Sequence, residues 1–378
     1  MKTTQLVFQK EGWHTTTGSE NFPKSQAQLV LVFGERLVFE KTNSYTFLRE
    51  EFPNASIVIN STSGEIHGDG VHDNTIVANA IFFEKSHIRT VEVNIKNHIE
   101  SYQAGAKIAN ELLEETDLQG IMIISDGNKV NGTRLTQALN EITNYKTLIT
   151  GGLAGDQARF EKTVVGLNSE PIEGKIVGIG FYGKHLSIGH GTVGGWDVFG
   201  PEREISKSEY NILYAIDEQP ALDLYKEYLG PHAKNLPGSA LLFPISLRAT
   251  ASATPVVRTI LSIDEENKSM TFAGDVPTGS IVRFMRANYD RIIDASAQAA
   301  EQAVTSLNTV PELAILISCV GRKLVLGQRT EEEIEVAREI FGNETLLTGF
   351  YSYGELSPSG SKCELHNQTM TITTFAEN

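Results

Sequence analysis

Hydrophobic and polar positions follow the same order three times along the chain. Residues 121–183 and 314–375 each read as an apolar strand, a short helix, a second apolar strand, a turn closed by glycine and a carboxylate, and a third strand. A fainter copy covers residues 29–84. The closing pairs are Gly64-Glu65, Gly155-Asp156 and Gly354-Glu355. Turns at strand ends collect irregular backbone and polar groups, so a ligand site is expected at turns of this kind.

The helices of the repeat carry recognisable end signals. In the last copy, Thr330 and Glu333 have the spacing of a capping box, and Gly342 predicts a left-handed stop. Longer amphipathic helices, predicted around residues 102–113 and 293–307, precede the two clear copies. The shared order of elements favours duplication, with some parallel strand pairing and right-handed crossovers.

Other strands disfavour a purely parallel sheet. The last strand, "TMTITTF", alternates in the manner of an antiparallel member, and residues 256–285 form a further β-rich stretch. The pattern therefore predicts an α/β (mixed α+β) fold, in which helices flank mixed sheets built from the repeated unit. Glycines and Pro201 interrupt the periodicity at residues 194–204, which predicts two domains, 1–200 and 201–378.

Composition narrows the classes of partner and compartment. The net charge is −15 and no basic run occurs, so neither nucleic acid nor an anionic membrane surface is expected as a partner. No apolar run approaches the roughly 20 residues that span a bilayer, and the first residues do not resemble a signal peptide. The 2 cysteines form neither a disulfide framework nor a CxxC motif. We therefore expect a cytoplasmic protein.

The segment "GHGTVGGWD", residues 189–197, is the densest unusual stretch. Its glycines allow close approach of the backbone, Trp196 supplies a flat apolar wall, and His190 can bind a metal or exchange a proton near neutral pH. A tight turn between strands with an incidental histidine explains the same pattern.

A second dense stretch is "TGFYSYGELSPSG", followed by "CELHNQTM". Tyr351 and Tyr353 alternate along the chain, so both are expected to face one side of an extended segment. His366 and Asn367 open the final strand. Ordinary packing of tyrosines over a sheet, with Asn367 bonded to local backbone, is the alternative.

The repeated carboxylates and nearby arginines suit a charged ligand. Asp156 and Glu355 can cap backbone N–H groups, or hold an ammonium group of a ligand. Arg258 and Arg283 can meet a carboxylate if their strands are neighbours, and otherwise pair with the acidic excess of the surface.

Enzyme signatures are scarce. The chain has no GxSxG elbow, HExxH helix or paired-cysteine zinc motif. Cys319 ends a predicted buried strand, which favours inert packing over nucleophilic use. His67 and His72 are five residues apart in a polar turn, where solvated side chains are expected rather than a metal site.

Long strings of the sequence resemble the FIST family, a two-part bacterial sensory module. The strings include "TGGLAGD", "GHGTVGGWDVFGPER", "QPALDLYKEYLG", "FAGDVPTGS", "LISCVGRKLVLGQRTEEE" and "TGFYSYGE". They occur in the family's order over nearly the whole chain. The resemblance implies a FIST N-like part in residues 1–200, a FIST C-like part in residues 201–378, cytoplasmic placement and small-ligand sensing without enzymatic activity.

The resemblance also implies candidate ligands and partners. Some stand-alone members bind haem, sense nitric oxide and control a separate sensor histidine kinase or a cyclic-di-GMP enzyme (diguanylate cyclase or phosphodiesterase). Haem b is therefore one expectation, and a homodimer is compatible with it. The family's motifs assign no iron ligand, but physical grounds select His190 first and His366 second. The other residues of this expected pocket are Trp196, Tyr351, Tyr353, Arg258 and Arg283.

Two alternatives remain open from the sequence. An iron-free module for an amino-acid-like solute would use Asp156, Glu355, Asn367 and an arginine. An undetected hydrolase would need an exposed Cys319 within reach of a base. In each case the expected place is where the middle and last copies of the repeat come together.

Overall fold

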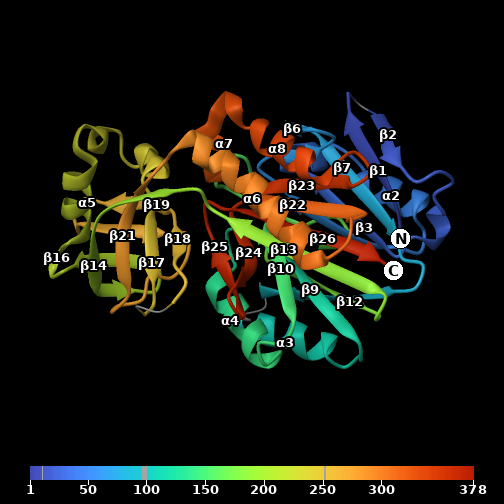
Figure 1. Cartoon of the computed structure of the whole chain (residues 1–378), viewed down its shortest axis with the longest axis horizontal. Helices are drawn as coiled ribbons and strands as arrows, with labels where there is room; N and C mark the ends of the chain where they lie inside the picture. Colours follow the sequence, from blue (N-terminus) through green and yellow to red (C-terminus); the bar gives the residue numbers. More distant parts are fainter. Residues whose placement is uncertain (11, 96–99, 251–252) are drawn as a thin grey trace.

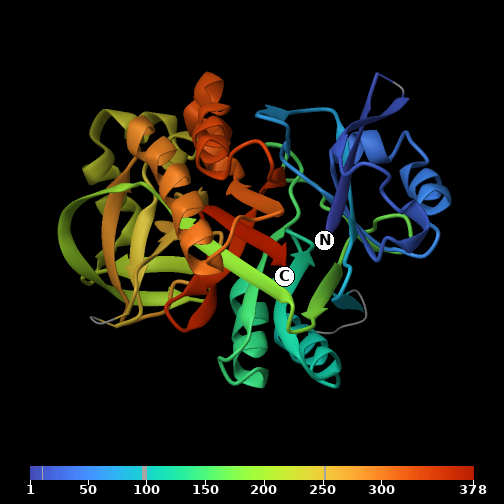
Figure 2. The same cartoon turned by 45° about the vertical axis from the view of Figure 1, so that its right-hand side comes forward.

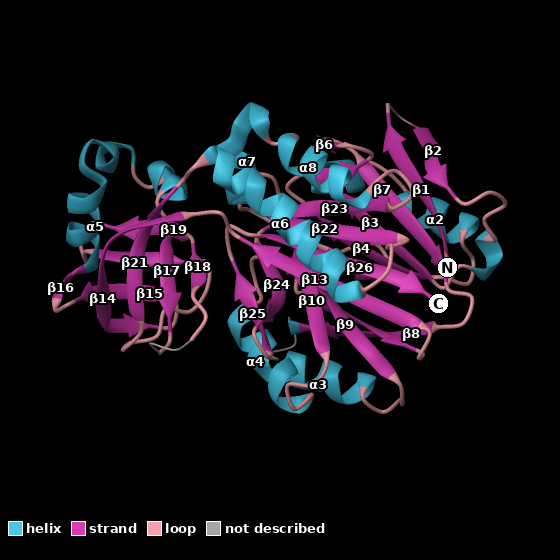
Figure 3. Cartoon of the chain, in the orientation of Figure 1, coloured by secondary structure: helices cyan, strands magenta, loops and turns pink. Residues whose placement is uncertain are grey.

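The computed structural model describes residues 1–10, 12–95, 100–250 and 253–378 (Figure 1). Three α/β units, in the order of the sequence repeats, pack around a shared core, and an antiparallel β unit stands at one end of the long axis. Helices flank sheets that hold both parallel and antiparallel strands (Figure 3), which confirms the predicted mixed fold.

Each repeated unit is built on one parallel pair of strands. The pairs are β3 (Leu29–Gly34) with β4 (Ser56–Ser61), β9 (Leu118–Ser125) with β10 (Leu148–Leu153), and β22 (Leu313–Cys319) with β23 (Leu346–Ser352). Most of these strand residues are buried on both faces, which explains why their sequences are apolar runs rather than alternating ones.

Antiparallel strands extend each pair on the side of its first member. The strands next to β3, β9 and β22 are β7 (Ile76–Phe82), β12 (Lys175–Tyr182) and β26 (Met370–Glu377). The strands beyond them are β1 (Lys2–Gln9), β8 (His87–Asn94) and β13 (Leu186–Val193), and β2 (Gly12–Gly18) pairs with β1. The three sheets therefore share one order.

The segment after each closing turn joins the sheet of another unit. The donated strands are β5 (Glu65–His67), which continues into β6 (Gly70–His72), β11 (Val165–Leu167), and β24 (Gly354–Ser359), which continues into β25 (Lys362–His366). The first unit gives β5 to β23, the second gives β11 to β4, and the third gives β24 to β10. This cyclic exchange ties the three units together through backbone hydrogen bonds.

The inner faces of the three sheets form one core, and the helices lie outside it. Leu31, Met122 and Ile315 come from the three units and belong to the same buried cluster. The termini lie close together (Figure 2), and the Met1 ammonium is 3.4 Å from the Glu377 carboxylate. The helices are η1 (Lys24–Gln26), α1 (Arg36–Phe39), α2 (Ser44–Glu51), α3 (Ser101–Leu112), α4 (Gly132–Ile142), α6 (Tyr289–Leu307), α7 (Val320–Leu326), η5 (Gly327–Arg329) and α8 (Glu332–Phe341).

Residues 197–286 form the antiparallel unit, which we call the insert. Its elements are β14 (Asp197–Glu209), β15 (Ile212–Ile216), β16 (Gln219–Pro220), α5 (Ala221–Leu229), η3 (Gly230–Asn235), η4 (Gly238–Leu242), β17 (Ile245–Arg248), β18 (Val256–Arg258), β19 (Ile260–Asp264), β20 (Ser269–Phe272) and β21 (Ile281–Arg286). The expected β-rich stretch at 256–285 lies here. The division at residues 200 and 201 stays a prediction, while β13, which precedes it, pairs with β26 at the end of the chain.

Candidate ligand-binding site

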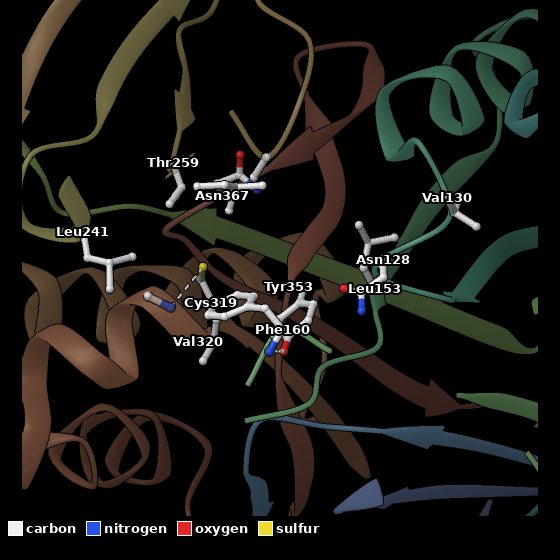
Figure 4. Close-up of a pocket in the computed structure, with 14 residues that line it drawn as sticks. Asn128, Val130, Leu153, Phe160, Leu241, Thr259, Cys319, Val320, Tyr353 and Asn367 are labelled. Atoms are coloured by element: carbon white, nitrogen blue, oxygen red, sulfur yellow. Dashed lines mark hydrogen bonds between the residues drawn. The ribbon is translucent and has the colours of Figure 1, made fainter. Parts of the chain in front are cut away.

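A cavity of about 100 Å³ lies where the second unit, the third unit and the insert meet (Figure 4). We call it the inner cavity. It adjoins a wider hollow of about 580 Å³, the outer hollow, which lies beside Pro237 and Gly238 of the insert. Asn128, Phe160 and Leu241 line both spaces, so a ligand in the inner cavity has room to extend outward.

The ends of two parallel strand pairs bring the walls of the inner cavity together. Leu153 ends β10 and Cys319 ends β22, while Asn128 follows β9 and Tyr353 follows β23. The carboxyl ends of parallel strands are the usual place for ligand sites in α/β sheets. The insert closes the remaining side.

Asn367 brings an unpartnered amide to this cavity. The side chain is completely buried, it lines the inner cavity, and neither its nitrogen nor its oxygen has a hydrogen-bond partner among the described residues. The Thr259 hydroxyl from the insert lines the same cavity and is likewise buried without a described partner. Buried polar atoms normally have partners, so these groups indicate a site that a ligand or water completes.

The turn that carries Asn367 is held firmly by its neighbours. The Trp196 indole nitrogen donates to Gln368 O at 2.8 Å, and Cys319 N donates to Thr369 O at 3.2 Å. The Thr369 hydroxyl donates to the Glu355 carboxylate at 3.0 Å. The Asn367 amide is therefore presented to the cavity by a fixed backbone.

Tyr353 and Phe160 form an aromatic wall. Their rings stack with centroids 4.7 Å apart, and Phe160 N donates to the Tyr353 hydroxyl at 3.1 Å. The hydroxyl in turn donates to Gln157 O at 3.2 Å, and burial raises the pKa of Tyr353. The Tyr353 side chain is therefore uncharged, and its hydroxyl already makes two hydrogen bonds within the protein.

Tyr351 does not join Tyr353, which corrects the expectation that both face one side. Tyr351 is fully buried under α8, and its hydroxyl donates to Glu333 at 2.9 Å. The chain leaves the third sheet after Ser352 and enters the second sheet at Gly354, so the two tyrosines fall into different cores.

The glycine-rich segment around His190 serves helix packing. A Cβ on Gly189 or Gly191 would lie 2.4 or 2.0 Å from a carbonyl oxygen of α6, so only glycine allows this helix to approach β13. His190 is half-buried on β13 and its backbone N donates to Ser306, and burial lowers the pKa of His190. His190 does not line the inner cavity. Trp196 does not line it either, but its indole N–H holds the turn that carries Asn367 by donating to Gln368 O.

The two arginines also lie apart. β17 separates their strands, and Arg258 is opposite Ile245 while Arg283 is opposite Ser246, so they point to opposite faces of the sheet. This corrects the expectation that they meet one carboxylate. Arg258 is buried and donates to Leu365 O at 2.8 Å, and burial lowers its pKa to about 10. Arg283 donates to Gly200 O.

The inner cavity does not fit a haem. A cavity of about 150 Å³ holds one benzene, which is far smaller than a tetrapyrrole, and the inner cavity measures about 100 Å³.

The other candidate iron and metal ligands are buried or paired. His366 is buried with Nε2 3.1 Å from Ser357 O, and burial lowers its pKa to about 4. Burial raises the pKa of Cys319, whose sulfur accepts from Gly321 N. Within the described ranges no group of three His, Cys, Asp or Glu side chains is placed to hold a metal ion, and His67 stacks on His72. A haem elsewhere on the chain stays a prediction.

Comparison with protein families decides the identity of this scaffold. Residues 28–219 match the model of the FIST N domain, and residues 221–358 match the model of the FIST C domain. The chain belongs to the FIST family. These FIST domains mark it as a small-ligand sensing module of signal transduction, as the resemblance implied.

Other comparisons add little to the FIST assignment. No curated protein matches the sequence. Among solved structures the chain is similar to a cyanuric acid hydrolase from A. caulinodans, with 7% identity, a TM-score of 0.38, and coverage of 94% of this chain and 92% of that one. That score carries no argument about chemistry. As far as the chain is described, none of its helices has the length and apolar character needed to cross a membrane.

The three repeated carboxylates of this FIST chain occupy different environments. Burial raises the pKa of Glu355 to about 8, although hydrogen bonds from Ser352 and Thr369 oppose the rise. Glu65 repeats this arrangement with two threonine hydroxyls, and burial raises its pKa to about 8. Burial also disfavours ionised Asp156, but hydrogen bonds from Arg159 and Arg36 outweigh it and hold the pKa of Asp156 below its usual range.

None of the three carboxylates is free to hold an ammonium group of a ligand. Asp156 is neutralised by two arginines, with Arg36 Nε 3.0 Å from Oδ1. Glu355 is not part of the lining of the inner cavity, and its two oxygens accept hydrogen bonds from Ser352 and Thr369. Its role is to position the turn that carries Asn367.

The opposite pKa directions predict opposite pH effects for two matched substitutions. Glu355 binds its proton more tightly in the folded state, so its contribution to stability is complete below about pH 4.5 and declines as the pH rises to about 8. Glu355→Gln removes that decline, and we expect its stability relative to wild type to rise across this window. Asp156 is stabilising when ionised, so Asp156→Asn should be destabilising above the ordinary aspartate pKa, with the deficit shrinking as the pH falls through the folded pKa.

Urea denaturation of Glu355→Gln at about pH 5 and about pH 8, and of Asp156→Asn at about pH 5 and about pH 3, checks this prediction. A Glu355→Gln variant whose stability relative to wild type is the same at both pH values would contradict the assigned protonation.

Sequence reasoning missed the residues that come from other parts of the fold. Thr259, Asn128 and Phe160 carry no motif of their own, and they reach the cavity through the docking of the insert and the loops of the second unit. The only local signal was the position of Thr259 beside Arg258 in the β-rich stretch.

Proposed function

We propose that this FIST chain senses a small molecule that binds in the inner cavity and extends into the outer hollow. The observation that carries the proposal is the Asn367 amide, fully buried, facing the cavity, and without a hydrogen-bond partner among the described residues. Such a group lowers the stability of the unliganded protein, and a ligand that bonds to it recovers the lost free energy.

Binding can report on the arrangement of three parts of the molecule. The ligand would touch Thr259 of the insert, Asn128 of the second unit and Asn367 of the third. The insert is otherwise held here by polar contacts such as Asn131 Nδ2 to Asp275 Oδ1, 3.1 Å. A ligand that bridges these parts favours the docked position of the insert by its differential affinity for that state.

The output of the proposed sensor goes to a separate protein. We propose a sensor histidine kinase or a cyclic-di-GMP enzyme in the cytoplasm, with the FIST chain acting as a monomer or a homodimer. The family membership supports a signalling role and leaves the partner to experiment. We propose no catalytic step, because Cys319 is buried and its sulfur accepts from the Gly321 N–H.

Replacing Asn367 with leucine separates binding from stability. We expect Asn367→Leu to keep or raise the free energy of unfolding, by up to about 1–3 kcal/mol, because an unsatisfied buried amide is removed. The same variant should lose the thermal stabilisation that a cognate ligand gives the wild type. A thermal-shift screen of both proteins against amino acids and other small metabolites measures the two effects.

Asn140→Leu is the matched control. Asn140 is also buried, but its amide donates to Cys363 O at 2.7 Å and accepts from Cys363 N at 2.9 Å. Its replacement should lower the free energy of unfolding, by about 1–3 kcal/mol. A screen in which no solute stabilises the wild type would count against the proposed function. A Soret band that shifts with nitric oxide would instead support haem sensing.

A further inference from the structure

The polar groups that face the inner cavity are uncharged. The Asn367 amide offers a donor and an acceptor side by side, and the Thr259 hydroxyl can do either. Both are buried and have no described partner, so both are available to a ligand. A carboxamide or lactam has an edge on which N–H lies beside C=O. That edge can form two hydrogen bonds with an asparagine amide, one donated and one accepted.

Ionisable side chains beside the cavity wall already have partners within the protein. The Arg258 guanidinium donates to the backbone carbonyls of Val257, Asp275 and Leu365. The Glu355 carboxylate accepts from Ser352 and Thr369. An ionic group placed at the bottom of the inner cavity would therefore lose its hydration without gaining a counter-ion, which is strongly unfavourable.

On the side of the cavity formed by the second unit, the ionisable side chain of Asp126 also has partners within the protein. Asp126 lies just before the cavity residues of its loop, and its carboxylate accepts from Thr163 Oγ1 and from the backbone N–H groups of Asn128 and Gly174. It too is unavailable to a ligand cation. The inner cavity thus discriminates by hydrogen-bond pattern rather than by charge.

The outer hollow is lined mainly by apolar side chains, and the Glu161 carboxylate in its lining is largely exposed to solvent. Leu241, Leu261 and Phe160 line both the inner cavity and the outer hollow. The side chains of Phe160 and Leu261 remain 46% and 48% exposed, which is unusual for large apolar residues beside a cavity. A ligand with an apolar flank would cover them.

We infer that the site takes an uncharged ligand with an amide-type edge, such as a carboxamide or lactam, joined to an apolar flank. The edge bonds to Asn367 and Thr259, and the flank lies against Leu241, Leu261 and Phe160. This inference rests on the proposed function and narrows it, because it excludes zwitterionic amino acids as the preferred ligands.

Three probes of similar size test the inference. Benzamide, benzoate and benzylamine share a phenyl ring and differ in the charge of the head group, and ligand-detected NMR titration compares their affinities for the full chain. We expect benzamide to bind at least about tenfold more tightly than either charged probe. Asn367→Asp should weaken benzamide by at least about tenfold, and Thr259→Val by a smaller factor.

The outcomes separate the inference from the proposed function. Benzoate binding as tightly as benzamide and losing affinity on Asn367→Asp, or benzylamine binding as tightly as benzamide and gaining affinity on Asn367→Asp, would overturn the uncharged ligand but support a ligand site at Asn367. Benzamide binding that is unchanged by Asn367→Asp would overturn the assigned contact. If none of the probes binds the wild type, the inference fails, and the separate metabolite screen decides whether the proposed function fails with it.

Discussion

Replacing Arg322 with methionine is expected to lower the free energy of unfolding by about 3–5 kcal/mol. The Arg322 side chain is fully buried, and its guanidinium pairs with the equally buried carboxylate of Glu333. Methionine fills much of the space but leaves the Glu333 charge inside the protein without its cation. Urea denaturation followed by circular dichroism measures the difference.

The pair is also the centre of a network that reaches the candidate site. Arg322 donates to Gly194 O at 2.6 Å and to Ile292 O at 2.7 Å, which joins α7 to the β13–β14 connection and to α6. The Glu333 carboxylate accepts from the Tyr351 hydroxyl. Because α7 begins at Val320 in the wall of the inner cavity, Arg322→Met should also reduce ligand-induced stabilisation.

Two controls identify the cause of the loss. Arg329→Met removes a guanidinium that pairs with Asp290 and Glu332 on the surface, and it should change stability little, because water and salt screen exposed pairs. Adding Glu333→Leu to Arg322→Met removes the stranded charge, so the double variant should recover much of the lost stability. An Arg322→Met protein as stable as the wild type would contradict the importance of this pair.

Glu333 also shows why spacing alone misassigned a residue. Its distance from Thr330 predicted a capping box, and the helix does begin nearby, at Glu332. The Thr330 hydroxyl, however, donates to Gly327 O at 2.6 Å, and Glu333 turns inward to Arg322. A cap and a buried ion pair place a carboxylate at the same sequence position, and only the packing of α7 against α6 and α8 distinguishes them.

The repeated unit was predictable because local rules determine it. Apolar runs, helix spacing and turn residues define each parallel pair, and the structure has all three pairs. The exchange of strands between units was not predictable, since β23 runs into β24 with only Tyr353 between them. Which sheet receives a strand depends on contacts with distant residues, and for that reason Tyr351 and Tyr353 separated.

The candidate site was predictable in the same limited sense. The sequence drew attention to Tyr353 and Asn367, which now line one cavity, and to His190, whose glycine neighbours serve the packing of α6. Glycines that permit close approach have the same signature whether the approaching group is a ligand or a helix. Thr259 had no motif of its own, and its hydroxyl became informative only once burial left it without a partner among the described residues.

Replacing Gly151 with alanine is expected to lower the free energy of unfolding by about 2–6 kcal/mol, as the sum of backbone strain and overpacking. Gly151 lies inside β10 with φ +140°, a conformation that side chains rarely adopt, and a Cβ would lie 2.0 Å from Ile123 O on the paired strand β9. The chain cannot relieve this contact without separating the two parallel strands. Thermal and urea denaturation measure the effect.

Gly238→Ala is the matched control, because a Cβ there has nothing within 4 Å, and its effect should stay within about 1 kcal/mol. The repeat sharpens the argument. Gly349 occupies the same position in β23, and a Cβ there would lie 1.8 Å from Leu316 O on β22. If Gly349→Ala is as damaging as Gly151→Ala, the glycine is a requirement of the parallel pair itself. Tolerance of Gly151→Ala would instead mean that the end of β10 can shift, and Leu153 with it, so that the inner cavity could change shape on binding.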